Sequence, residues 1–226
     1  MQGNGHDGEL AGVAEDVAAS VPNARAERIL EAATRAIVRR GFGSTRISDI
    51  AREAGTSTGT VHYYFETKDD VLVAALTWAN EESYEFMRQA LEEETSSAAR
   101  LARLIDLSIP YPGIQFDWWV LWIELWVRVL HRPDLRAHSE EVSQRWRDYF
   151  LDVILEGTRS GEFSPVGQPD EVTERLVALV DGLAFQVVVE HHWMPPERMR
   201  ELVLRYASDE LRVPVEALEE GSLSKD

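Results

Sequence analysis

The chain has 226 residues, a formal net charge of −17 and no cysteine. This length suffices for one domain or two small ones with a sizeable core, and the lack of cysteine excludes disulfides, thiolate metal sites and a thiol nucleophile. The longest apolar run, Trp118–Ile123, is far shorter than the roughly 20 residues that span a bilayer, and no signal pattern opens the chain. We therefore expect a cytoplasmic protein with no membrane partner.

The acidic charge lies mostly outside one short segment. Residues 22–70 carry eight Arg and Lys against seven Asp and Glu, whereas residues 1–21 hold four acids and no Arg or Lys. DNA requires positive charge only where it is contacted. The total charge therefore does not exclude a nucleic-acid contact through residues 22–70.

Helical periodicity begins after an irregular start. Residues 1–21 are rich in Gly, Ala and acids, and we expect them to form a mobile tail. From Ala24, apolar residues spaced at i, i+3, i+4 and i+7 predict an amphipathic helix that ends at Gly41. Short helices are predicted over Ile47–Ala54 and Thr58–Tyr64.

Longer helices fill the rest of the chain. Their predicted ranges are Lys68–Glu94, Ser96–Leu107, Trp118–Leu130, Leu135–Ser160, Asp170–Glu190 and Glu197–Leu211. Trp118–Leu130 is apolar almost all round, which predicts burial. Residues 214–226 are acidic and are expected to form a frayed tail. Because no segment alternates with the period of a strand, the predicted fold class is all-α.

The two short helices have the pattern of a helix-turn-helix. The first presents Ile47, Ile50 and Ala51 to a core, and Gly55 follows it where a tight turn favours glycine. Ser57 is a good N-cap for the second helix. Two helices joined in this way place the second one in the major groove of DNA.

The second short helix is unusually polar for a core element. Thr58, Thr60, His62 and Tyr63 all carry hydrogen-bonding groups. Gly59 costs a helix about 1 kcal/mol relative to Ala, and close approach to a phosphate backbone is a physical reason to keep it. These features indicate a DNA-reading helix.

The stretch from about Arg28 to Leu76 closely resembles the TetR family of bacterial regulators. Its most specific part is Asp49-Ile-Ala-x-x-Ala-Gly55, followed by Ser57-x-Gly-Thr-Val-x-x-Tyr-Phe-x-x-Lys68. The resemblance implies a dimeric transcriptional regulator that binds duplex DNA. His62 is a departure, because the family usually has Tyr at this position.

The resemblance also implies roles for single residues. Phosphate contacts are expected from Thr45, Ser57, Thr60 and Lys68, and contacts at or near base edges from Thr58, His62 and Tyr63. Arg46 and Thr56, which flank these positions, complete the predicted DNA-binding set.

The predicted organisation follows from these elements. Residues 22–70 form a three-helix helix-turn-helix DNA-binding domain, and residues 71–213 form a larger helical ligand-binding and dimerisation domain. Residues 1–21 and 214–226 are the tails at either end.

An aromatic cluster marks the second domain. It comprises Tyr111, Phe116, Trp118, Trp119, Trp122 and Trp126. At helical spacing, several of these rings share one broad face. Such a face is either a bulky core or the wall of a pocket for a hydrophobic or cationic effector, and the sequence leaves both open.

Acidic residues near the cluster bear on the charge of an effector. Glu124 has a structural alternative, an i, i+4 pair with Arg128. Asp181 lies within an apolar run and needs a partner if it is buried. The segment from Trp118 to Leu183 also resembles, more loosely, the choline-responsive regulators of betaine synthesis, which makes an amine or quaternary ammonium a candidate effector.

The sequence predicts a homodimer and no metal site. We expect a homodimer through helices 135–160 and 170–190, which the family resemblance pairs in a four-helix bundle. One helix-turn-helix reads few bases, whereas two read a palindrome.

His191 and His192 are adjacent in sequence, so on a helix their side chains would point about 100° apart. No cofactor or metal site is predicted.

The leading hypothesis is a repressor released from its operator by a small ligand. The alternative within regulation is a DNA-binding dimer whose aromatic cluster is only core. From other classes, an α-helical enzyme lacks a thiol, a phosphate loop and a His/acid constellation, and an acidic adaptor leaves the polar second helix unexplained.

Overall fold

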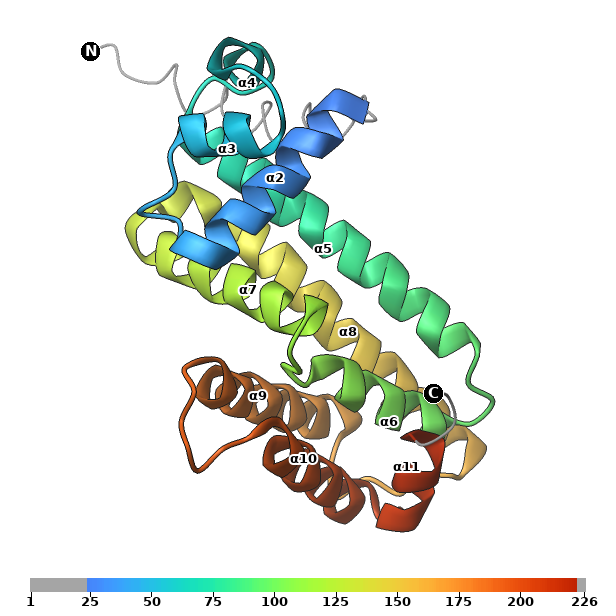
Figure 1. The fold of residues 1–226 in the computed structure, drawn as a ribbon. Helices are drawn as coiled ribbons and strands as arrows, with labels where there is room; N and C mark the ends of the chain where they lie inside the picture. The colour runs from blue at the N-terminus through green and yellow to red at the C-terminus, as the bar shows by residue number, and fades with distance from the viewer. Residues whose placement is uncertain (1–23, 223–226) are drawn as a thin grey trace, which may run out of the picture. The chain divides into compact units, whose positions relative to one another are not determined.

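The structure is a computed structural model that describes residues 24–222, with side-chain surroundings as far as residue 219 (Figure 1). The expected tail over residues 1–21 lies outside the described residues. In chain order the helices are α2 (Ala24–Arg40), α3 (Ile47–Glu53), α4 (Thr58–Tyr64), α5 (Lys68–Glu92), α6 (Ser97–Ser108), α7 (Ile114–His131), α8 (Arg136–Ser160), α9 (Pro169–Val188), α10 (Pro196–Leu211) and α11 (Val215–Ser222), with a 3-10 turn η1 (Pro133–Leu135) before α8. No strand occurs between residues 24 and 222, which confirms the all-α prediction.

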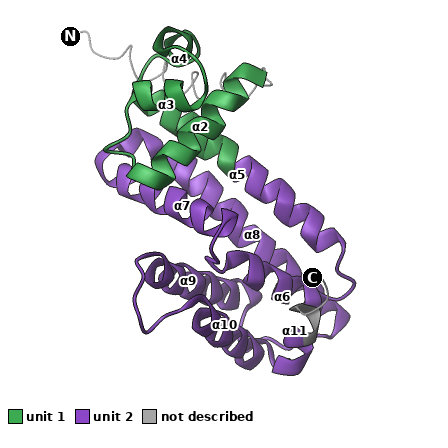
Figure 2. Cartoon of the chain, viewed as in Figure 1, with its two compact units in different colours: residues 1–79 green, residues 80–226 purple. Residues whose placement is uncertain are grey.

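The chain divides into two compact units, residues 1–79 and 80–226 (Figure 2). The division falls within α5 rather than at residue 70, where the sequence analysis placed a domain boundary. The start of α5 belongs to the first unit because Val71, Leu72 and Ala75 are fully buried in it. The helix itself continues unbroken into the second unit.

The first unit has a small aliphatic core. Ile29 and Ile37 of α2, Ile50 of α3 and Val61 of α4 are all fully buried. At its surface, Arg35 of α2 pairs with Glu53 of α3. Exposed ion pairs contribute about 0–1 kcal/mol each, so the apolar contacts are the main stabilising term.

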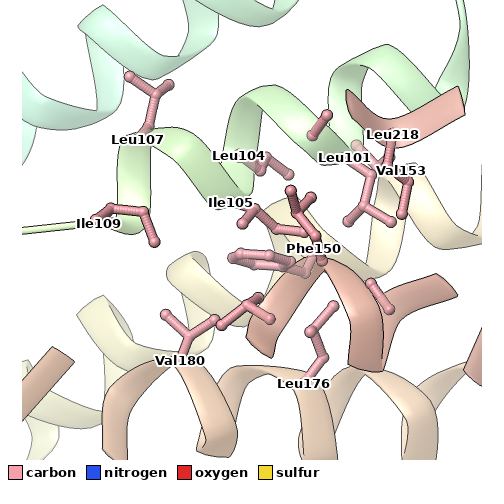
Figure 3. Close-up of a cluster of buried hydrophobic side chains, with 14 of the residues drawn as sticks. Leu101, Leu104, Ile105, Leu107, Ile109, Phe150, Val153, Leu176, Val180 and Leu218 are labelled. Carbon is pink, nitrogen blue, oxygen red and sulfur yellow. The ribbon is translucent and has the colours of Figure 1, made fainter. Parts of the chain in front are cut away.

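The second unit is built around Phe150 of α8, which is fully buried (Figure 3). Leu104 and Ile105 of α6 and Leu176 and Val180 of α9 surround its ring in this view. Burying a side chain of this size contributes about 1.5–3 kcal/mol. This core fixes α6, α8 and α9 relative to one another.

Most predicted helix ends lie within two residues of the observed ones, but two segments differ more. Helix α7 starts at Ile114 rather than Trp118, because Gly113 at φ 122° turns the chain directly into the helix. The expectation of a frayed acidic end is wrong for Val215–Ser222, which forms α11. The reason is Leu218, which is fully buried in the core that includes α6, so a single apolar anchor outweighs the acidic composition.

None of the helices that the structure describes is long and apolar enough to cross a membrane.

Gly157 provides a test of packing in α8. A Cβ at this position would lie 2.2 Å from Cδ2 of the buried Phe163 ring. Helix propensity favours Ala over Gly by about 1 kcal/mol, but overpacking costs about 1–3 kcal/mol. We therefore expect Gly157→Ala to lower Tm by about 5 °C in a thermal melt.

The double variant Gly157→Ala/Phe163→Leu serves as the control. Removing the ring relieves the clash, so the two substitutions together should destabilise less than the sum of the single changes. A Gly157→Ala protein at least as stable as the wild type would contradict this packing.

Candidate nucleic-acid interface and effector cavity

Helix α4 begins at a rigid turn. Gly55 adopts φ 63°, the left-handed conformation that glycine allows. Ser57 then caps the helix, since its Oγ accepts a hydrogen bond from the Thr60 backbone N–H at 3.1 Å and lies 3.0 Å from Thr60 Oγ1. The turn and the cap together fix where α4 starts and which side faces outward.

The two faces of α4 differ sharply. Val61 and the following Phe65 are buried in the first unit. Thr58 and His62 are exposed, and Tyr63 keeps 81% of its surface accessible. An exposed row of hydroxyl, imidazole and phenol groups on an anchored helix suits the reading of base edges in a major groove.

Two predicted phosphate contacts have internal partners. Thr45 is fully buried, and its hydroxyl donates to the carbonyl oxygens of Gly41 at 2.8 Å and Ala36 at 3.2 Å. The expectation that this hydroxyl holds a phosphate does not match its placement, because it closes the loop between α2 and α3. Lys68 Nζ donates to the carbonyl oxygen of Phe42 at 2.7 Å, a tie that the sequence analysis did not foresee.

The remaining predicted DNA contacts stay predictions. Arg46 and Ser57 are exposed, whereas Thr56 and Thr60 are half-buried beside the turn. The Arg46 backbone N–H donates to Asp49 Oδ2 at 3.2 Å, which caps α3. These residues lie together around the start of α3 and of α4.

A cavity of about 90 Å³ lies inside the second unit. Trp118, Trp119, Trp122 and Trp126 of α7 and Asp181 of α9 line it. Their role in binding an effector stays a prediction. The predicted Tyr111 and Phe116 do not line it. The residues that the sequence analysis missed are Ser83, Tyr84, Met87, Leu107, Ser108, Gln115, Ser143, Trp146 and Val177.

The tryptophans form part of the core and part of the cavity wall. The Trp122 and Trp126 ring centroids lie 6.0 Å apart, and those of Trp119 and Trp126 lie 6.5 Å apart. Trp119 is buried, and its Nε1 donates to the Ser108 carbonyl oxygen at 2.8 Å. The structure thus resolves the alternatives left open by the sequence, because the cluster is both core and cavity lining.

Asp181 is the unusual group in this cavity. Among the described residues it makes no hydrogen bond and no ion pair. Burial raises the pKa of its carboxyl from 3.8 to about 7, because the ionised form loses hydration without gaining a partner. A bound cation would supply that partner.

An open groove of about 740 Å³ runs along α8 and α9 beside the cavity. Ser143, Val177 and Asp181 line both spaces. Arg147 in the groove is paired with Asp170 at 3.0 Å. The groove is more open to water than the aromatic cavity, so the cavity is the better candidate for a ligand site.

In the described residues, an all-α fold with a helix-turn-helix whose second helix is exposed and polar is the architecture of a DNA-binding regulator. The model of the bacterial regulatory proteins of the tetR family matches residues 29–75. The model of the BetI-type transcriptional repressor C-terminal domain matches residues 97–212. The chain therefore belongs to the TetR family of transcriptional regulators, with a C-terminal domain of the BetI type.

Individual relatives agree with this assignment. A putative transcriptional regulator from Saccharomonospora viridis, solved in complex with choline, is 33% identical and has a TM-score of 0.78; the match covers 82% of this chain and 96% of that chain. The regulator BetI of Pseudomonas fluorescens is 27% identical over 70% of this chain and 79% of its own length. FadR from Bacillus subtilis, solved with stearoyl-CoA, shares the fold at 20% identity and a TM-score of 0.59, covering 79% of this chain and 95% of that chain.

A substitution at Gly59 can distinguish whether α4 has glycine there for the fold or for contact with DNA. A Cβ at this position would meet only Ser57 Oγ, at 3.7 Å, which is ordinary contact. The fold therefore does not require glycine here, and Ala should stabilise the helix by up to about 1 kcal/mol. We expect Gly59→Ala to keep its thermal stability and to bind operator DNA about tenfold more weakly in mobility-shift titrations. Unchanged DNA affinity would show that no backbone approaches this position.

The raised pKa of Asp181 makes stability depend on pH. The folded protein keeps the Asp181 proton up to about pH 7, whereas the unfolded chain releases it near pH 4. Between these values the folded state binds more protons, so this group removes stability as pH rises, by about 4 kcal/mol in full.

Asp181→Asn stays neutral and lacks this penalty. We expect its Tm advantage over the wild type to grow by roughly 5–10 °C between pH 5 and pH 8. Asp209→Asn, at an exposed position of α10 in the same unit, is the matched control and should show no such trend. An Asp181→Asn curve parallel to the wild type would mean that this carboxyl is not buried alone.

Proposed function

We propose that the protein is a homodimeric repressor that leaves a palindromic operator when a compact cation, of the quaternary ammonium class, binds the cavity. The observation that carries the proposal is the Asp181 carboxylate, which faces an aromatic cavity without a partner. The proposal connects this site to the DNA-binding surface of α4.

The cavity chemistry favours a cation whose methyl groups can pack against aromatic rings. Indole rings attract a cation through their faces, by about 0.5–2 kcal/mol each depending on desolvation. Trp118, Trp122, Trp126 and Trp146 supply such rings, and Asp181 supplies the countercharge. A quaternary ammonium carries its charge at every pH and presents methyl groups that pack against rings.

The size of the cavity favours a compact effector. Pockets for drug-sized ligands measure roughly 300–1,000 Å³, and this cavity measures about 90 Å³. A choline-sized molecule suits that volume better than a long acyl chain. The choline bound in the Saccharomonospora viridis regulator supports the same class of ligand.

The surface of α9 supports a homodimer. Ala178, Gly182, Phe185 and Val189 follow one another at i, i+4, i+7 and i+11 and are all exposed. Phe185 keeps 43% of its surface accessible and Val189 keeps 42%. A second copy of the chain would cover this apolar stripe, whereas the exposed part of α8 is mostly polar, so α9 supplies the stronger half of the predicted interface.

The DNA-binding surface is assigned to α4 and the residues around its turn. Thr58, His62 and Tyr63 are the proposed readers of base edges, and Ser57 and Thr60 position the backbone. Two copies of α4 in a homodimer would read the two halves of a palindrome.

The alternative of a ligand-independent regulator is less well supported. It requires a solid core around Trp122, whereas Trp122 borders a cavity that also holds an unpaired carboxylate. For an enzyme, the described residues offer no cluster of three or more His, Cys, Asp or Glu that could hold a metal ion.

The direct test is a mobility-shift titration with the promoter region of the protein's own or a neighbouring operon. Choline should release the wild type from a specific fragment, because a ligand that favours one state by several kcal/mol shifts occupancy decisively. Asp181→Asn should bind the same fragment and require about tenfold more choline, since an unpaired buried carboxylate is lost.

Asp209→Asn is the control and should respond like the wild type. The proposal fails if no fragment is bound specifically at moderate salt, or if choline releases wild type and Asp181→Asn at the same concentration.

A further inference from the structure

The hydrogen-bonding groups of the cavity are already partly committed. Ser83 Oγ donates to the Asn80 carbonyl oxygen at 2.8 Å, and Ser108 Oγ donates to the Leu104 carbonyl oxygen at 2.6 Å. Tyr84 Oη donates to the Val142 carbonyl oxygen at 2.8 Å. Each of these hydroxyl hydrogens is bonded to a main-chain carbonyl oxygen. Toward the cavity, these side chains can therefore only accept hydrogen bonds.

Gln115, at the start of α7, also donates to a main-chain carbonyl oxygen. Its Nε2 donates to the Asp106 carbonyl oxygen at 3.0 Å, which fixes the orientation of the amide. The Asp106 carboxylate is paired with Arg200 of α10 at 2.7 Å, which holds the residue that accepts from Gln115 in place. Gln115 lines the cavity and is half-buried, and within the described residues its Oε1 accepts no hydrogen bond.

We propose that Gln115 determines effector specificity, with Oε1 accepting a hydrogen bond from a hydroxyl or N–H group at the end of the effector remote from its cationic head. This inference rests on the proposed cation site. Asp181 and the indole rings would hold the head, and Gln115 would read the other end of a short molecule in the same small cavity.

The consequence is a distinction between an alcohol and its oxidised counterpart. A hydroxyl donates to Gln115 Oε1, whereas a carboxylate has acceptors only and could accept only from the second Nε2 hydrogen of Gln115, since the first one bonds the Asp106 carbonyl oxygen. A carboxylate would also share a cavity of about 90 Å³ with the Asp181 carboxylate, which is a like-charge repulsion in a poorly hydrated space. Neutral indole N–H groups and the Ser143 hydroxyl also border the cavity, but they do not remove that repulsion.

The selected effector is therefore an amino alcohol rather than a zwitterionic amino acid of the same size. Oxidation of a primary alcohol to a carboxylate turns a ligand that fits into one that is rejected.

Calorimetric titration with three probes tests this proposal. The probes are choline, propyltrimethylammonium, which replaces the hydroxyl by a methyl, and glycine betaine, which replaces the alcohol by a carboxylate. The wild type should bind choline about fivefold to tenfold more tightly than propyltrimethylammonium, and glycine betaine at least about tenfold more weakly than choline.

Gln115→Met is the informative variant, because it keeps the length of the side chain and removes the acceptor. It should bind choline and propyltrimethylammonium within about twofold of each other, with the affinity for propyltrimethylammonium unchanged. Gln89→Met, an exposed position outside the cavity, should keep the wild-type preference. If Gln115→Met does not fold, Gln115→Asn withdraws the amide by one methylene and should lose most of the preference.

The outcomes separate the two proposals. If wild type binds choline and propyltrimethylammonium equally, the role of Gln115 is overturned while the cation site stands. If Gln115→Met keeps the preference for choline, another group reads the hydroxyl and the assignment is wrong. If none of the three compounds binds the wild type, the cation site fails and the inference falls with it.

Discussion

The proposed function depends on one group, the Asp181 carboxyl, which lines the tryptophan-rich cavity without a partner among the described residues. Burial without a partner raises the pKa of the Asp181 carboxyl from 3.8 to about 7, so ionising this group is unfavourable in the folded protein. A cation in the same space would convert that cost into binding energy. The indole rings, the small volume and the committed hydroxyl groups all act in the same direction, because they favour a small cation that carries a hydrogen-bond donor.

The helix-turn-helix could be predicted from sequence because its determinants are local. The turn glycine, the cap Ser57 and the alternation of anchoring and exposed residues in α4 lie within a few positions of one another. The sequence could not reveal which hydroxyl groups already form hydrogen bonds within the fold. Thr45 fits a phosphate contact by type, yet its burial against α2 carbonyl oxygens is a tertiary effect that no local pattern encodes.

The cavity was predicted in part for a related reason. The tryptophans of α7 share one helical face, so they could be grouped from spacing alone, and Asp181 was notable as an acid in an apolar run. Tyr84, Gln115 and Trp146 come from three different helices, and only the packing of the second unit brings them to one space. Trp146, an aromatic residue in the polar first half of α8, was the one signal that sequence offered for them.

Helix α5 begins in the first unit and continues into the second. It starts at Lys68, whose ammonium binds the loop that precedes α3, and further along it carries Ser83, Tyr84 and Met87 of the cavity lining. One continuous helix thus carries residues of both units.

The most direct test of the central claim is a crystal structure of the protein grown with choline. The account predicts the trimethylammonium group within about 6 Å of the centroids of Trp122 and its neighbouring indole rings, with the Asp181 carboxylate as its countercharge. Choline bound elsewhere, or an unoccupied cavity at saturating choline, would contradict it.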